Sequence, residues 1–117
     1  MRTYIVTGAA SGIGLATVKL IESQGDRAIG VDIKDCQVIA DLSALDGRQE
    51  AVEIVTALAD GHVDAVIANA GLGLPIAQTV SVNFFGAIEI IEGLRPAMLK
   101  SKSPRVVATS SMASLMP

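Results

Sequence analysis

The chain has 117 residues, of which 50% are apolar and 3% aromatic, and it carries a formal net charge of −3. That acidic balance argues against nucleic acid or an anionic membrane as a partner, and no apolar run reaches the ~18 residues that cross a bilayer. The single cysteine, Cys36, cannot form an internal disulfide, and the N-terminus shows no signal-peptide pattern. We therefore expect a cytoplasmic protein whose residues 1–117 form one domain.

Apolar runs and helical periodicity alternate along the first half of the chain. They predict strands at 3–7, 27–32 and 37–40, with a helix at 12–24 between the first two strands. Gly25 is expected to end that helix in the left-handed conformation. The apolar positions with helical spacing, which we expect to face the core, are Ile13, Ala16, Leu20 and Ile21.

The second half continues the alternation. A helix is predicted at 45–59 with Val52, Val55 and Leu58 on one face, followed by a strand at 63–68. A helix at 80–99 and a strand at 105–109 complete the series. Such alternation predicts right-handed βαβ units and an α/β fold, a Rossmann-type doubly wound parallel sheet between two helix layers, incomplete at its C-terminal half.

A glycine-rich turn joins the first strand to the first helix and reads Thr7-Gly8-Ala9-Ala10-Ser11-Gly12-Ile13-Gly14. Glycine lets the backbone approach a phosphate closely, and a helix N-terminus offers unpaired N–H groups to the anion. This arrangement predicts a binding site for a dinucleotide pyrophosphate. The residues that we expect to bind it are Gly8, Ser11, Gly12, Ile13 and Gly14.

A carboxylate ends the second strand at the position expected for a dinucleotide site. Asp32 follows Gly14 by 18 residues, which suits a side chain that accepts hydrogen bonds from the adenosine ribose hydroxyls. A carboxylate there also repels a 2′-phosphate, so the sequence favours NAD over NADP. Lys34 is expected to point to solvent, and an ordinary strand-end turn is the alternative role for Asp32.

The glycine spacing resembles that of the short-chain dehydrogenase/reductase family, whose fingerprint is Thr-Gly-x-x-x-Gly-Ile-Gly. Two further segments resemble family landmarks, namely Asp41-Leu42 and Asn69-Ala70-Gly71. The resemblance implies that Asp41 lies near the amino group of adenine and Leu42 near its face. It also places Asn69, Ala70 and Gly71 beside the cofactor, with Ala68 standing where the family has a first asparagine.

The same resemblance implies catalytic roles in the C-terminal part of the chain. Asn83 matches the helix asparagine that holds a proton-relay water, and Ser111 matches the serine that positions the substrate oxygen, with Ser110 in a structural role. Segments 31–43 and 81–86 resemble the bacterial 3α-hydroxysteroid dehydrogenase/carbonyl reductase branch. The implied reaction interconverts a secondary alcohol and a ketone, steroid-like or otherwise apolar, in an enzyme that is a homo-oligomer at full length.

The acid–base group of this family is a tyrosine in Tyr-x-x-x-Lys, and no such pattern occurs in residues 1–117. The single tyrosine, Tyr4, lies in the first strand. Two interpretations follow: the chain is the N-terminal part of a longer dehydrogenase, or it is a half-domain that binds dinucleotide without catalysis. In either case the predicted uncovered sheet edge leads us to expect that residues 1–117 alone are unstable or associate.

Other function classes fit the residues less well. An S-adenosylmethionine methyltransferase also pairs a glycine turn with an acidic strand end, but Gly-Ile-Gly, Asn-Ala-Gly and Ser-Ser argue against it. A P-loop ATPase is excluded because no Gly-Lys-Ser/Thr follows the glycines. His62 is expected to be a solvated turn residue, and no cluster of ligand side chains predicts a metal site.

Overall fold

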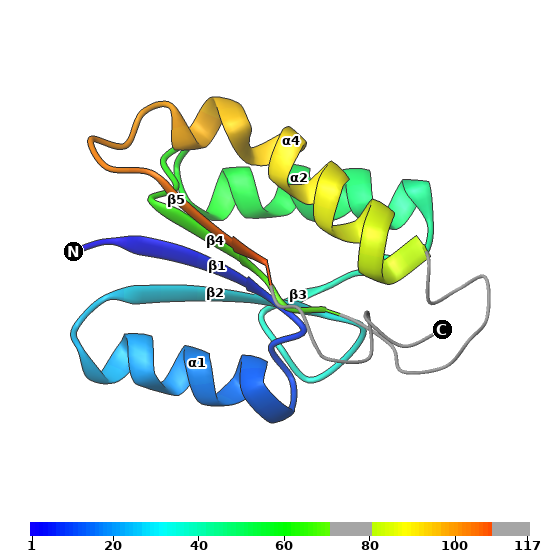
Figure 1. The fold of residues 1–117 in the computed structure, drawn as a ribbon, viewed down its shortest axis with the longest axis horizontal. Coiled ribbons are helices and arrows are strands. Elements are labelled where there is room, and N and C mark those ends of the chain that lie inside the picture. Colours follow the sequence, from blue (N-terminus) through cyan, green and yellow to red (C-terminus); the bar gives the residue numbers. More distant parts are fainter. Residues whose placement is uncertain (71–80, 109–117) are drawn as a thin grey trace, which may run out of the picture.

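The structure, a computed structural model, describes residues 1–70 and 81–108 (Figure 1). The strands are β1 (Thr3–Thr7), β2 (Arg27–Asp32), β3 (Val38–Ile39), β4 (Ala65–Ala68) and β5 (Arg105–Ala108). The helical elements are α1 (Gly12–Ser23), α2 (Leu45–Leu58), a π-helical turn η1 (Ser81–Gly86) and α4 (Ala87–Met98).

All the strand pairs are parallel, and the described strands form one sheet in the order β3-β2-β1-β4-β5. Figure 1 shows α1 on one face of this sheet and α2 with α4 on the other. The connection from β1 leads to one side of the sheet and the connection to β4 comes from the other side. The expected Rossmann-type three-layer fold is thereby confirmed.

The sheet separates two apolar clusters of unequal size. The larger one, under α2 and α4, includes Ile5, Ile29, Val66 and Leu94, each fully buried. The smaller one, under α1, is built around Val6 and a few neighbours. Because the central strands are covered on both faces, their sequences are continuous apolar runs rather than alternating patterns.

Helix α1 presents a different face to the sheet from the one that periodicity predicts. Of the four positions expected to face the core, Ile21 is buried as predicted, but Ile13 and Leu20 are 69% and 59% exposed and Ala16 is exposed as well. Gly14 is buried instead. Val18 packs with Ile21 against the smaller cluster. The rotation follows from the close packing of Gly14 on the glycine turn, described below, which only a residue without a side chain allows.

The remaining differences from the predicted elements concern their boundaries. One helix was predicted at 80–99, but a π-helical turn precedes α4. In such a turn the hydrogen bonds join residues five apart instead of four. The predicted strand at 63–68 begins at Ala65, and the Val63 N–H donates to the Ala97 carbonyl of α4 rather than to a neighbouring strand. Gly25 has a φ of 85°, which confirms its helix-ending role.

Strand β5 lies at one edge of the described sheet and pairs with β4. All four of its residues are exposed, including Val106 and Val107 on opposite faces. Within the described ranges, no helix is both long enough and apolar enough to span a membrane.

Candidate dinucleotide site

The expected cofactor residues come together at the carboxyl ends of neighbouring strands. Thr7 ends β1, Asp32 ends β2 and Asn69 follows β4 directly. Since α1, the helix after β1, and α4, a helix after β4, cover opposite faces of the sheet, the crevice in which open α/β sheets bind their ligands is expected at the carboxyl ends of these two strands.

Hydrogen bonds fasten the glycine turn to the strands on either side. The Thr7 hydroxyl oxygen accepts from the amides of Asn69 and Ala70 at 2.9 and 3.0 Å, which joins the ends of β1 and β4. On the other side the Gly8 amide donates to the Val31 carbonyl of β2 at 2.8 Å. The turn is therefore shaped by residues far from it in the sequence.

Two glycines of the turn are required by contacts of their own. A Cβ on Gly14 would lie 2.0 Å from the Gly8 carbonyl oxygen, and a Cβ on Gly8, whose φ is 69°, would lie 2.9 Å from Ala70 Cα. The side-chain amide nitrogen of Asn69 would lie 2.8 Å from the Cβ on Gly14 and 3.1 Å from the Cβ on Gly8. This packing leaves no room for a side chain at either glycine, and it places Asn69 against the glycine turn.

The beginning of α1 suits an anionic group. Ser11 takes the N-cap position with an extended backbone, its hydroxyl makes no capping bond within the described residues, and the first helical turn contains no acidic residue. The first N–H groups of a helix have no partners inside it. At Gly12, whose φ is 57°, the space beside the backbone is open. These features fit a bound pyrophosphate.

Asp32 stands beside the glycine turn and also shapes it. One carboxylate oxygen accepts from the Ala10 amide at 2.9 Å, and the other accepts from the Ile33 amide at 2.7 Å. Lys34 is exposed, as expected. The turn role and the ribose-binding role of Asp32 are therefore compatible, because each oxygen of a carboxylate can accept a further hydrogen bond.

The adenine-side segment is a tight turn that leads into α2. The Asp41 carboxylate accepts from the hydroxyl and the amide of Ser43 at 2.6 and 2.9 Å, and these bonds lower the pKa of Asp41. Leu42 is buried within the larger core cluster. A Cβ on Gly47 would lie 1.9 Å from the Asp41 carbonyl oxygen, so α2 begins in contact with this turn.

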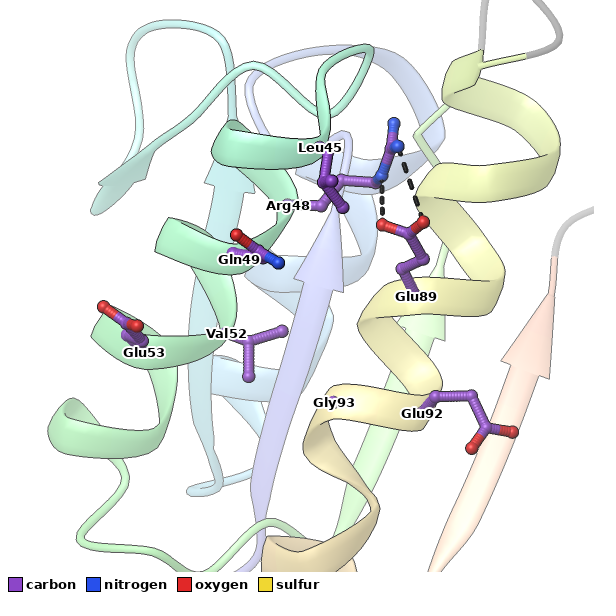
Figure 2. Close-up of a pocket in the computed structure, with 8 residues that line it drawn as sticks. All are labelled: Leu45, Arg48, Gln49, Val52, Glu53, Glu89, Glu92 and Gly93. Atoms are coloured by element: carbon purple, nitrogen blue, oxygen red, sulfur yellow. Dashed lines mark hydrogen bonds and ion pairs between the residues drawn. The ribbon is translucent and has the colours of Figure 1, made fainter.

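Sequence reasoning missed Arg48, whose guanidinium is buried between α2 and α4 (Figure 2). It forms an ion pair with Glu89 of α4 and donates through Nη1 to the Leu42 carbonyl at 3.1 Å. The Phe85 ring of η1 lies with its centre 6.0 Å from the guanidinium carbon. The signal was available, because Arg48 has helical spacing with Val52 and Val55 on the inward stripe of α2.

A groove of about 550 Å³ follows the same helix pair. Figure 2 shows the Arg48–Glu89 ion pair at one end of it and Glu53 and Glu92 farther along. The residues that line it are Leu45, Arg48, Gln49, Val52, Glu53, Glu89, Glu92 and Gly93.

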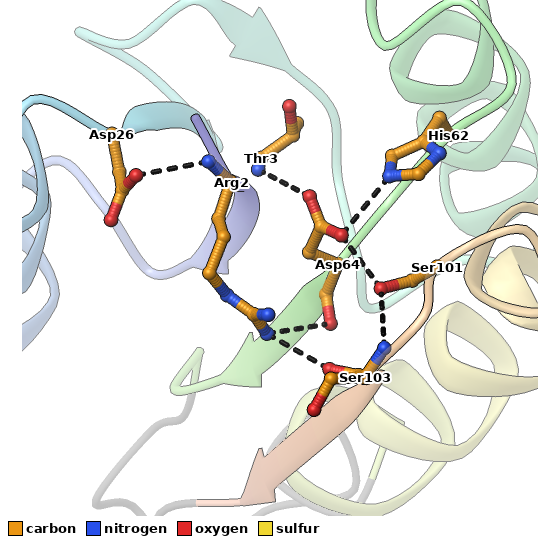
Figure 3. Close-up of polar contacts among 7 residues, drawn as sticks. All are labelled: Arg2, Thr3, Asp26, His62, Asp64, Ser101 and Ser103. Carbon is orange, nitrogen blue, oxygen red and sulfur yellow. Dashed lines mark hydrogen bonds and ion pairs between the residues drawn. The ribbon is translucent and has the colours of Figure 1, made fainter.

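A second missed residue, Asp64, forms hydrogen bonds at the amino ends of the strands, on the side of the sheet away from the glycine turn (Figure 3). Its carboxylate accepts from the Thr3 amide at 2.8 Å and the Ser101 hydroxyl at 2.6 Å, and His62 Nε2 lies 3.0 Å from it. Burial raises the pKa of Asp64, but the hydrogen bonds from Ser101, Thr3 and His62 outweigh that effect and bring the pKa down to about 2. An acidic residue opening an apolar strand was the signal in the sequence.

The other candidates divide into described and undescribed residues. Asn83 is exposed on η1. Cys36 is half-buried, its thiol donates to the Val38 carbonyl, and burial raises the pKa of this thiol. The predicted cofactor residue Gly71 and catalytic residue Ser111, with Ser110, lie outside the described residues. Among residues 1–70 and 81–108, no three His, Cys, Asp or Glu side chains are grouped so that they could hold a metal ion.

Comparisons with known proteins agree with this geometry. The 3-alpha-hydroxysteroid dehydrogenase/carbonyl reductase of Comamonas testosteroni is 41% identical in an alignment that covers 97% of this chain and 46% of that protein. The crystal structure of the 3-alpha-hydroxysteroid dehydrogenase from Pseudomonas sp. B-0831 complexed with NADH superposes with a TM-score of 0.95 at 34% identity, covering 99% of this chain and 47% of that one. The chain thus spans about half the length of these relatives.

The fold alone does not select between the two nicotinamide dinucleotides. A metagenomic short-chain oxidoreductase solved in complex with NADP has the same fold, with a TM-score of 0.81, 24% identity and coverage of 96% of this chain and 62% of that one. The family model for short chain dehydrogenase matches residues 2–117. The sequence match, the glycine turn and the sheet order lead to one conclusion: the chain belongs to the short-chain dehydrogenase/reductase family.

Proposed function

We propose that the protein is an NAD(H)-dependent oxidoreductase that interconverts a secondary alcohol and a ketone, with a steroid-like or similarly apolar substrate. The observation that carries the proposal is the Asp32 carboxylate, which stands 2.9 Å from the Ala10 amide of the glycine turn. In that place it can accept from both ribose hydroxyls, and it repels a 2′-phosphate. The substrate class follows from the two hydroxysteroid dehydrogenase relatives.

When bound, the dinucleotide supplies or accepts the hydride. The protein's part is to orient it: the glycine turn and the start of α1 hold the pyrophosphate, Asp32 the ribose, and the Asp41–Leu42 turn the adenine. Asn83 would hold a water in a proton relay, and Ser111 would orient the substrate oxygen. A carbonyl oxygen also needs an acid, which in this proposal is a tyrosine outside residues 1–117.

The proposal is tested by the affinities of NADH and NADPH for the protein in its full native reading frame. We expect NADH to bind at least about tenfold more tightly than NADPH, as repulsion of one extra phosphate requires. Asp32→Asn keeps an oxygen that can accept from Ala10 but removes the charge, so it should bring the two affinities together. Asp35→Asn makes the same charge change on an exposed residue of the following loop and should leave the ratio unchanged.

Turnover is then assayed with apolar secondary alcohols and NAD. Oxidation of a hydroxysteroid supports the whole proposal, whereas NADH binding without turnover of any alcohol or ketone supports the non-catalytic alternative. A wild-type protein that binds neither dinucleotide contradicts the proposal, and equal affinities for NADH and NADPH contradict its choice of cofactor.

A further inference from the structure

We propose that Arg48 is a positioning residue for the adenosine half of the cofactor. Its guanidinium fixes the Asp41–Leu42 turn to the framework of α4 and η1. The inference rests on the proposed dinucleotide site, and it assigns a role to a residue that lies outside the glycine turn and the strand ends.

The guanidinium donates a hydrogen bond from each of its three nitrogens. Nε and Nη2 face the two carboxylate oxygens of Glu89, and Nη1 donates to the Leu42 carbonyl. Arg48 is 7% exposed and Glu89 is half-buried. A planar fork whose two sides reach different partners sets their relative positions, which a flexible ammonium cannot do.

The Leu42 carbonyl is the point at which the fork acts on the proposed adenine pocket. Asp41 precedes it directly, and the Asp41 carbonyl is packed against Gly47 and accepts from the Ala44 amide at 3.3 Å. These contacts fix the side of the turn that faces α2. The bond from Arg48 holds the carbonyl of the next residue, so the backbone of Asp41 and Leu42 is held by hydrogen bonds at both carbonyls.

Stability alone is a weak explanation for this arrangement. A buried ion pair is often no more stabilising than a well-packed apolar pair, since both charges must leave water. Val52 already packs against Gly93 across the same helix pair, so α2 and α4 have apolar contact without the ion pair. What apolar side chains could not supply is a donor for the Leu42 carbonyl.

The same guanidinium reaches the element that carries Asn83. Phe85 lies two residues after Asn83 in η1, and its ring is within range of a cation–π contact with Arg48. Glu89 follows one helical turn later in α4. Arg48 therefore links the adenine-side turn to the helix that holds the proposed proton-relay residue.

The test compares ligands that contain different halves of the cofactor. We measure the dissociation constants of NADH, AMP and reduced nicotinamide mononucleotide for the full protein and for Arg48→Lys. We expect the constants for NADH and AMP to rise about tenfold, the effect of losing a charged hydrogen bond, while that for the mononucleotide changes less than about twofold. Glu89→Gln should move them in the same direction by less.

A purely structural role has a different signature. It would weaken all three ligands together in proportion to a lower unfolding temperature, and that result overturns the inference. Unchanged NADH and AMP affinities in Arg48→Lys overturn it as well. Glu92→Gln, a carboxylate change on α4 in the same groove, is the matched control and should alter none of the affinities.

Two outcomes remain to be separated. If Arg48→Lys does not fold, Glu89→Gln decides, because it leaves the Leu42 bond in place but loosens the guanidinium: unequal loss of AMP and mononucleotide affinity supports the inference, and equal or no loss overturns it. If the wild type binds neither NADH nor NADPH, the proposed function itself is wrong.

Discussion

Single polar side chains hold together segments that are distant in sequence. The Thr7 hydroxyl accepts from two amides beyond β4, and Asp32 accepts from the glycine turn. At the other edge, the Asp64 carboxylate joins the start of β1 to the turn after α4. Each of these side-chain oxygens accepts hydrogen bonds from other segments, so a substitution that removes such an oxygen leaves the donating groups without partners.

The Asp64 contacts give a pH-dependent contribution to stability. The folded-state pKa of about 2 lies below the ordinary 3.8, so ionised Asp64 stabilises the fold above pH ~5 and this contribution is lost as the pH falls from about 4 toward 2. We expect Asp64→Asn to reduce the free energy of unfolding by about 1–3 kcal/mol at pH 6 and by less at pH 3. Urea unfolding at both pH values measures the difference.

Asp60→Asn is the control for this experiment. Asp60 is exposed and has a φ of 53°, a conformation that asparagine adopts readily, so its substitution should change stability little at either pH. A penalty for Asp64→Asn that is the same at pH 6 and pH 3 would contradict the assigned pKa.

At the scale of elements, contacts at a single glycine decide how a helix is oriented. Periodicity alone assigns Ile13, Leu20 and Ile21 to the buried face of α1, but only Ile21 is buried there, together with Gly14 and with Val18 partly buried. The reason is the 2.0 Å separation that a Cβ on Gly14 would have from the Gly8 carbonyl. Exposed Ile13 is left beside the glycine turn, at the edge where the dinucleotide is proposed to bind.

Gly14→Ala should therefore displace α1 from the turn. We expect a loss of several kcal/mol in stability, since overpacking against backbone costs about 1–3 kcal/mol or more, together with at least tenfold weaker NADH binding. Gly25, with a φ of 85° and open space around it, follows the end of the same helix. Gly25→Ala should therefore reduce the free energy of unfolding by about 1–2 kcal/mol without changing NADH affinity. Calorimetry and fluorescence titration report both quantities, and wild-type NADH affinity in Gly14→Ala would refute the packing argument.

At the scale of the whole molecule, the described sheet has one edge strand with little cover. Val106 and Val107 are 46% and 55% exposed on β5, while the strands in the centre of the sheet are buried. Exposed apolar edge strands favour pairing between chains.

Residues 1–117 produced alone should accordingly associate at micromolar concentration. Val107→Lys should shift the population toward monomer, because a charge on an edge strand opposes pairing. Light scattering after size-exclusion chromatography distinguishes the states, with Ile54→Lys, at an exposed position of α2, as a control for added charge. A wild-type chain that elutes as a 12.0 kDa monomer contradicts the expectation.

The sequence predicted the architecture well because it depends on local patterns. Apolar runs and turn residues placed β1 and β2 to the residue, and the strand alternation gave the parallel sheet. The cofactor roles of Gly8, Asp32 and Asp41 remain predictions, although the structure places all three at the expected edge. Arg48 and Asp64 were missed because their partners Glu89 and Ser101 lie 41 and 37 residues away, and the local pattern at each position marks an unusual residue without identifying its partner.

The Thr7 hydroxyl has a consequence for how this chain folds. Its two bonds span 62 and 63 residues, so the glycine turn reaches its final shape only after a large loop has closed and β4 has docked beside β1. A partly folded chain then has no competent site, and ligand binds the native state alone. Dinucleotide at 100 times its dissociation constant would add about 2.7 kcal/mol to the folded state, making the cofactor a reporter of complete folding.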